Sequence, residues 1–200
     1  MQNSFVEMSN IALFRTIFGA DVQLNTNSLL EIFGLILPVE DGVYASEMRA
    51  QYLVLPEIAA FKELYLRAMN ESMTTKNCFE NPTMIKDYLR GRVAHLGHEV
   101  FGVLFVDAGN VLIKDEILFS GTLTQTSVYP REVVRKSLAY NAASVIFYHN
   151  HPSGNSKPSG NDEILTSTLK KALCLVDVRV LDHFIISACS AYSMAENGMM

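Results

Sequence analysis

The feature that most constrains the fold is an apolar run, Ala143 to Phe147, that leads into the sequence HNHP at residues 149–152. A short apolar run of this kind predicts a buried strand. Residues at positions i and i+2 of a strand point to the same side, so His149 and His151 can converge on one point. The sequence therefore predicts a buried strand whose end carries two imidazoles on one face.

A third candidate ligand follows this strand. After a loop rich in Pro, Gly and Ser, Asp162 comes directly after Ser159-Gly160-Asn161, where a helix is expected to begin. Its carboxylate would then project back towards the strand end. Catalytic zinc typically takes three protein ligands from His, Asp or Glu and leaves a fourth position for water. His149, His151 and Asp162 therefore form the predicted ligand set for Zn²⁺.

Hydrolysis by metal-activated water also needs a base that takes the water's proton and returns it to the leaving amine. The candidate is Glu99, which opens the apolar strand Val100 to Val106 and can face a cleft from the strand end. A strand-end glutamate can also be an ordinary surface residue. Glu116 and Glu132 are weaker rivals, since neither opens a buried strand.

Two further polar residues near these ligands each have two interpretations. Ser159 can donate a hydrogen bond to the oxyanion that develops on a scissile carbonyl, or it can only cap the helix that follows. His183 lies in an apolar strand. It is either a hydrogen-bonded core histidine or a partner that supports a metal ligand.

The chain around the histidine strand alternates between strand and helix signals. In chain order we expect a helix at 82–92, strands at 100–106, 111–113 and 117–119, a helix at 131–141, the strand ending at His149, a helix at 161–174 and a strand at 179–187. This alternation predicts the α/β class, with helices packed around a mixed sheet as a sandwich or in three layers.

The front of the chain has a different character. A polar, turn-rich stretch from Ser72 to Pro82 is the candidate linker. Before it, the segments Ser28 to Leu35 and Leu55 to Met69 carry apolar residues at helical spacing. We therefore predict a helical region at residues 1–76 and a second domain at residues 77–200.

Composition restricts the class of protein further. The chain's 200 residues suit one ordinary domain, or one domain of moderate size with a small appendage, and a hydrophobic fraction of 49% is enough to build a core. No apolar stretch approaches the ~20 residues that span a bilayer, and the N-terminus lacks a signal-peptide pattern, so we expect a cytoplasmic protein. The net charge of −5 argues against extensive contact with nucleic-acid phosphates. Cys78, Cys174 and Cys189 form no CxxC pair and are expected to be small core residues.

At these residues the chain resembles the JAMM (MPN-type) metalloprotease family, whose motif is a Glu, then His-x-His-Pro, then Ser-x-x-Asp. Glu99 matches the glutamate, His149 and His151 the histidine ligands, Ser159 the oxyanion serine and Asp162 the acidic ligand. The resemblance is closest to the bacterial RadC-like branch. It covers about residues 77–200, with further matching segments at 127–134, 181–186 and 192–198.

The resemblance implies a cytidine-deaminase-like α/β/α core around a mixed sheet, preceded by a small helical region. It also implies zinc-dependent cleavage of a peptide or isopeptide bond in a peptide or protein substrate, without identifying that substrate or an oligomeric state. Longer RadC-like proteins carry a helix-hairpin-helix region before the metal domain, and Leu55 to Met69 resembles a degenerate remnant of it. The glycines that such a hairpin uses to reach phosphate are missing around Leu53 to Ala60, so we expect no strong nucleic-acid binding there.

Two alternatives remain open. The consecutive letters HNH at residues 149–151 superficially match a nuclease motif. That motif, however, spreads its three residues over a ββα unit. The other alternative is a non-catalytic or DNA-associated RadC-like protein with a structural or vestigial metal site. An intact base and an open fourth coordination position count against it.

Overall fold

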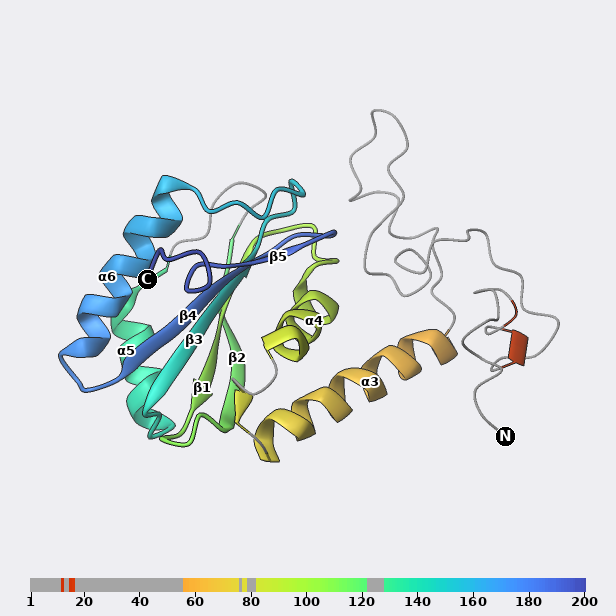
Figure 1. Cartoon of the computed structure of the whole chain (residues 1–200), viewed down its shortest axis with the longest axis horizontal. Coiled ribbons are helices and arrows are strands. Elements are labelled where there is room, and N and C mark those ends of the chain that lie inside the picture. The colour runs from red at the N-terminus through yellow and green to blue at the C-terminus, as the bar shows by residue number, and fades with distance from the viewer. Residues whose placement is uncertain (1–11, 13–14, 17–55, 76, 79–81, 122–127) are drawn as a thin grey trace. The chain divides into compact units, whose positions relative to one another are not determined.

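A five-stranded sheet forms the core of residues 65–200 (Figure 1). We describe it from a computed structural model, in which residues 12, 15–16, 56–75, 77–78, 82–121 and 128–200 are described. By compactness the chain divides into residues 1–64 and 65–200, and the sheet belongs to the second unit. The predicted helical segment Ser28 to Leu35 lies outside the described residues. None of the described helices combines the length and the apolar character that crossing a bilayer requires.

The elements follow the predicted alternation closely. In chain order they are α3 (Pro56–Thr75), α4 (Pro82–Val93), β1 (Val100–Val106), β2 (Leu112–Ser120), α5 (Pro130–Ala139), β3 (Ser144–Asn150), α6 (Gly160–Cys174), β4 (Arg179–Ile186) and β5 (Ala191–Ser193). Three of the helices begin at a proline, which fits the first helical turn because its missing N–H has no partner there in any case. The division into domains at residue 76 stays a prediction.

The sheet is mixed, with strand order β2-β1-β3-β4-β5. The pair β3 and β4 is parallel, while β1 is antiparallel to both β2 and β3, and β5 is antiparallel to β4. A parallel pair needs a crossover connection, which α6 provides here. The first turn of α6 therefore follows the carboxyl end of β3, where the two histidines lie.

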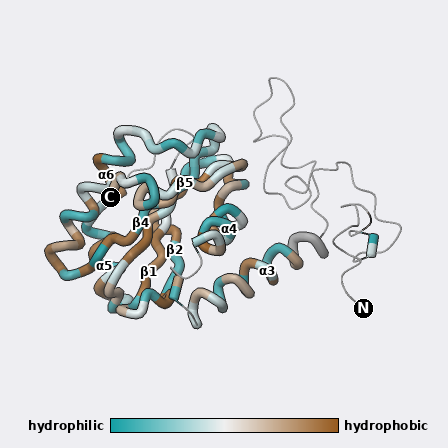
Figure 2. Tube along the Cα trace, in the orientation of Figure 1, coloured by the Kyte–Doolittle hydropathy of each residue, from teal (hydrophilic) through white to brown (hydrophobic). Residues whose placement is uncertain are grey.

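Alternating residues of the central strands pack against helices on opposite faces of the sheet. Phe101, Val103 and Phe105 of β1 belong to the core cluster that includes residues of α5 and α6. Val100, Leu104 and Val106 belong to the cluster that includes α4 and the end of α3. The central strands are strongly hydrophobic (Figure 2). This three-layer α/β/α arrangement confirms the predicted fold class.

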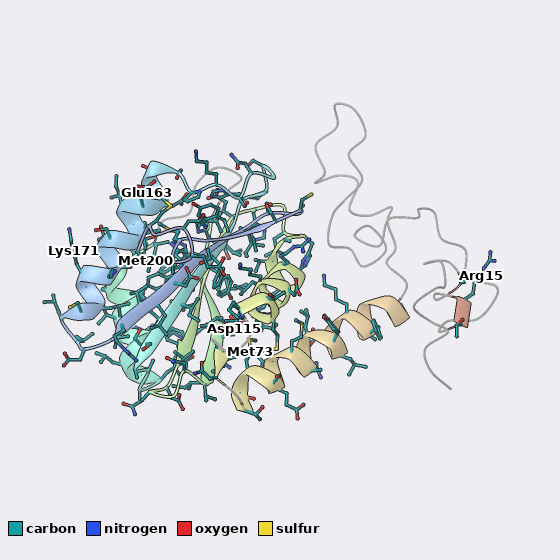
Figure 3. The ribbon with its side chains drawn as sticks, viewed as in Figure 1. Arg15, Met73, Asp115, Glu163, Lys171 and Met200 are labelled. Atoms are coloured by element: carbon teal, nitrogen blue, oxygen red, sulfur yellow. The ribbon has the colours of Figure 1, made fainter. Side chains whose placement is uncertain are left out.

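Two boundaries differ from prediction. The strand signals at 111–113 and 117–119 belong to one continuous strand, β2, because its central acidic residues find partners. Asp115, labelled in Figure 3, accepts hydrogen bonds from Tyr88 and Tyr148, and Glu116 accepts one from Lys136. Helix α3 continues through Thr75, into the predicted linker, because Met73 is fully buried and packs in the core. The short edge strand β5 was not predicted.

The prediction that the cysteines are core residues is correct only for Cys78, which is buried and whose thiol pKa is raised to about 11 by that burial. Cys174 and Cys189 are exposed. Cys174 is the last residue of α6, and the neighbouring Leu173 takes the core position there. Cys189 lies in the turn closed by the Ser187 N–H and the Ser190 carbonyl oxygen.

Gly102 of β1 makes room for a tyrosine of β3. It lies directly opposite Tyr148, and a Cβ atom at this position would overlap the Tyr148 ring. Tyr148 is fully buried and donates its hydroxyl to Asp115 at 2.5 Å. We expect Gly102→Ala to lower the free energy of unfolding by about 1–3 kcal/mol through overpacking, measured by urea denaturation. Gly160→Ala, where no atom lies within 4 Å of an added Cβ, should leave it nearly unchanged. Equal stability of the two variants would contradict this account.

Candidate metal centre

Strand β3 places His149 on the face of the sheet that α6 covers. Val145 and Phe147 belong to the core cluster on this face, and His149 continues their alternation. His149 is 6% exposed. His151 follows the strand and donates its backbone N–H to the Ile186 carbonyl oxygen at 2.8 Å, which keeps the chain aligned with β4. Both predicted histidine ligands therefore lie at one end of β3.

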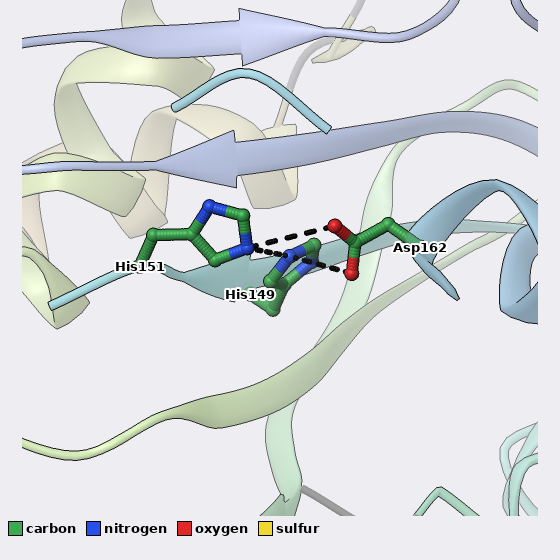
Figure 4. A group of neighbouring side chains, drawn as sticks. All are labelled: His149, His151 and Asp162. Atoms are coloured by element: carbon green, nitrogen blue, oxygen red, sulfur yellow. Dashed lines mark hydrogen bonds and ion pairs between the residues drawn. The ribbon is translucent and has the colours of Figure 1, made fainter. Parts of the chain in front are cut away.

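A capping box with Ser159 holds Asp162 at the start of α6, and Figure 4 shows the Asp162 carboxylate facing the two histidines. The Ser159 backbone N–H and hydroxyl each donate to Asp162 Oδ2 at 2.7 Å, and the Asp162 N–H donates back to Ser159 Oγ at 3.3 Å. A capping box satisfies backbone donors that would otherwise lack partners in the first turn. Here it also turns the Asp162 carboxylate towards the histidines, as the sequence predicted.

The three side chains form a group that could hold a metal ion. One ligand atom from each residue lies within 4.8 Å of the others. Nε2 of His149 is 2.9 Å from Nε2 of His151, and these atoms are 3.2 and 3.6 Å from Asp162 Oδ1 and Oδ2 respectively. In tetrahedral coordination with metal–nitrogen distances near 2.0–2.1 Å, ligand atoms are separated by about 3.3–3.4 Å. The observed separations of 2.9, 3.2 and 3.6 Å lie on both sides of this value, so the group could hold one such ion.

The arrangement of the nitrogen and oxygen atoms of these three side chains favours a bound cation. Nδ1 of His151 lies 2.7 Å from the Asn155 carbonyl oxygen, which can only accept, so Nδ1 carries the hydrogen. In the neutral imidazole, Nε2 then presents a lone pair. This lone pair faces Nε2 of His149 and the Asp162 carboxylate. A metal ion or a proton between these groups would remove the repulsion among their lone pairs.

The pKa values of Asp162 and His151 show the same attraction for positive charge. Burial alone would raise the pKa of Asp162, but the imidazoles of His149 and His151 beside its carboxylate, together with the Ser159 hydroxyl, hold the pKa well below its ordinary value. The pKa of His151 is raised, chiefly by its hydrogen bond with Asp162. Metal binding would displace the proton that these groups share, so its affinity should depend on pH.

Glu99 lies beside this group. Phe101 pairs with His149, and continuing the antiparallel register by two residues places Glu99 opposite His151. The negative charge of Glu99 contributes to the raised pKa of His151. The two other glutamates considered as the base have different partners. Glu116 accepts hydrogen bonds from Lys136 and Tyr140, and Glu132 accepts two from the Arg135 guanidinium.

Asn150, between the two ligands, has a role that the sequence did not reveal. It points to the opposite face, where its Oδ1 accepts the Val100 N–H at 2.8 Å. Its Nδ2 donates to the carbonyl oxygens of His98 at 3.0 Å and Leu96 at 3.3 Å. Asn150 therefore fixes the segment that carries Glu99. It is also unavailable as a partner of the two histidines in a nuclease-like site.

His183 is one of the supporting residues. Its Nε2 lies 2.8 Å from His149 Nδ1 and its Nδ1 lies 2.6 Å from Thr166 Oγ1, so it contacts a predicted ligand directly. Burial, followed by the nearby His149, lowers the pKa of His183 well below its ordinary value. Thr166 was not singled out from the sequence. The sequence feature that could have identified Thr166 is its place, as a polar residue, on the same helix face as the buried Leu169 and Leu173.

The mixed sheet, its helices on both faces and the His-x-His and Asp group at the end of β3 define a JAB/MPN-type domain. A family model described as the RadC-like JAB domain matches residues 79–199. The chain belongs to this RadC-like family.

Similar proteins carry the name UPF0758 protein. One from Polaromonas sp. is 55% identical over 144 residues, covering 72% of this chain and 64% of that protein. One from Dechloromonas aromatica is 53% identical over 145 residues, covering 72% and 64%. One from Pseudomonas fluorescens is 45% identical over 175 residues, covering 86% and 78%. The chain thus spans slightly less than two thirds of the length of the first two relatives.

Proposed function

We propose that this chain is a zinc-dependent metallopeptidase that hydrolyses a peptide or isopeptide bond in a peptide or protein substrate in the cytoplasm. The observation that carries the proposal is the convergence of His149, His151 and Asp162 at one strand end. The charge of Glu99 also contributes to the raised pKa of His151. Two imidazole nitrogens and one carboxylate oxygen form a typical donor set for catalytic zinc. Magnesium and calcium prefer sites built from oxygen alone.

A zinc ion bound there would act as a Lewis acid and lower the pKa of a coordinated water to about 7. Glu99 would accept a proton from the attacking water and return it to the leaving amine. Asp162 and the two histidines hold their places through the capping box and the register of β3. Cleavage of a peptide bond requires such a proton transfer, because an amine leaves poorly unless it is protonated.

Ser159 has two roles in this proposal. Its hydroxyl donates to Asp162 in the structure, as part of the helix cap. To stabilise an oxyanion it must turn that hydrogen towards the substrate carbonyl. The Ser159 backbone N–H would continue to hold the Asp162 carboxylate meanwhile, since it donates to the same oxygen at 2.7 Å.

The first test is the metal content of the purified full chain by elemental analysis. We expect one zinc per chain in the native protein and in the control His98→Ala, and none in His151→Ala, because His151 supplies one of three ligands. Native protein should cleave members of an internally quenched peptide library. A chelator should abolish this cleavage and added zinc should restore it. Native protein that holds no metal even after zinc is added would instead indicate a binding module with a vestigial site.

A further inference from the structure

A buried chain of hydrogen-bonding groups runs behind His149. Thr166 Oγ1 lies 2.6 Å from the Asp162 carbonyl oxygen and 2.6 Å from His183 Nδ1, and His183 Nε2 lies 2.8 Å from His149 Nδ1. Thr166 is 3% exposed and His183 is fully buried. The chain thus leads from α6 through β4 to β3. It begins at the backbone of one ligand, Asp162, and ends on the ring of another, His149.

The hydrogen of Thr166 can be assigned from chemistry. A hydroxyl has one hydrogen to donate, and a carbonyl oxygen can only accept. At 2.6 Å the Thr166 hydroxyl must therefore donate to the Asp162 carbonyl oxygen. The Met194 sulfur, 3.6 Å from Thr166 Oγ1, is a much weaker acceptor. An oxygen lone pair of Thr166 then faces His183 Nδ1, which must carry the hydrogen of that contact.

The same reasoning assigns the ring hydrogens of His183 and His149. The His183 ring lies edge-on to the Phe101 and Phe147 rings, with centroids 5.6 and 5.8 Å away, and such an apolar setting disfavours imidazolium. A neutral ring with its hydrogen on Nδ1 has a lone pair on Nε2. That lone pair accepts the hydrogen on His149 Nδ1. Nε2 of His149, which faces Asp162 and His151, is then left as a lone pair.

We propose that Thr166 and His183 are positioning residues that hold His149 in the tautomer with an unprotonated Nε2, the form that can bind a metal ion. The opposite direction of the chain would place a hydrogen on that nitrogen and block it. Thr166 stands one helical turn after Asp162, so α6 supplies the carboxylate ligand and also sets the tautomer of an imidazole ligand. The identity of the metal rests on the function proposed above, whereas the tautomer does not.

The first test compares zinc affinities of full-length variants, measured by competition with a chromophoric chelator. Thr166→Val keeps the shape and removes the hydroxyl, and we expect the apparent Kd for zinc to rise about 10–100-fold, the usual effect of losing such a supporting partner. Thr166→Ser should restore native affinity. Thr168→Val is the matched control, because exposed Thr168 donates to the Ile164 carbonyl oxygen at 2.8 Å in the same way without touching a histidine.

The second test reads the tautomer directly. Ring ¹⁵N shifts of the metal-free full chain should show His149 with its hydrogen on Nδ1 in the native protein and in Thr168→Val, and a shift towards Nε2 in Thr166→Val. An unchanged His149 tautomer in Thr166→Val would overturn the proposal. Native protein that binds no zinc would refute the proposed function while this spectrum still decides the inference.

A further pair of variants tests the proposal through His183 and leaves Thr166 unchanged. In His183→Gln the amide oxygen can still accept the hydrogen of His149 Nδ1, so zinc affinity should stay within about 10-fold of native. His183→Leu offers no acceptor and should bind zinc more weakly than His183→Gln. Equal affinities for these two variants would contradict the proposal.

Discussion

Glu99→Gln should lower the turnover of the zinc-loaded protein by about 10²–10⁴-fold while its metal content stays the same. A neutral amide cannot accept the water's proton, but it keeps nearly the same shape beside His151. The histidine and aspartate ligands are untouched by the change. The measurement is the initial rate of cleavage of the peptide identified in the library, together with elemental analysis of the same samples.

Glu132→Gln is the matched control for this substitution, since Glu132 is paired with Arg135 on α5. It should retain native turnover and native zinc. If Glu99→Gln also retained native turnover, Glu99 would have no role as the base. If it instead lost zinc, Glu99 would act through the metal site.

Asp115→Ala should lower the free energy of unfolding by about 2–4 kcal/mol, because it leaves two buried tyrosine hydroxyls without an acceptor and removes a partly exposed ion pair. The Asp115 side chain is 4% exposed and lies 2.5 Å from the Arg92 guanidinium. It accepts hydrogen bonds from Tyr88 at 2.6 Å and Tyr148 at 2.5 Å. The variant leaves two buried hydroxyls and a guanidinium without this partner, and each such loss is costly.

Urea denaturation followed by circular dichroism measures this change. Asp87→Ala, at an exposed position of α4, should change the free energy of unfolding by less than about 0.5 kcal/mol. Adding Tyr148→Phe to Asp115→Ala should cost less than the sum of the two single changes, because both remove the same hydrogen bond. Strict additivity would mean that Tyr148 and Asp115 do not interact energetically.

The ligand group was predictable because its signals are local. Two histidines at alternate positions of an apolar strand must share a face, and a Ser-x-x-Asp sequence marks a helix start. The order and type of the elements around them followed from alternating apolar runs. These local patterns alone predict that His149, His151 and Asp162 lie on converging elements.

The supporting roles of Asn150 and Thr166 were not predictable in the same way, because their partners are distant in the chain, and the sequence left two interpretations open for His183. Asn150 bonds backbone groups about fifty residues earlier, and Thr166 meets His183 only because α6 crosses the sheet there. Continuous β2 was missed for a related reason. Its acidic residues interrupt the apolar pattern and are matched by tyrosines, an arginine and a lysine from other elements.

Asn150 also links two parts of the site that appear separate in the sequence. Its neighbours His149 and His151 serve one face of β3, while its own amide holds the segment leading to Glu99 from the other face. Because side chains alternate with a period of two, a one-residue slip of this strand would exchange the faces and disable both parts at once. The candidate ligands and the proposed base therefore cannot be adjusted independently, because the same three consecutive residues support both.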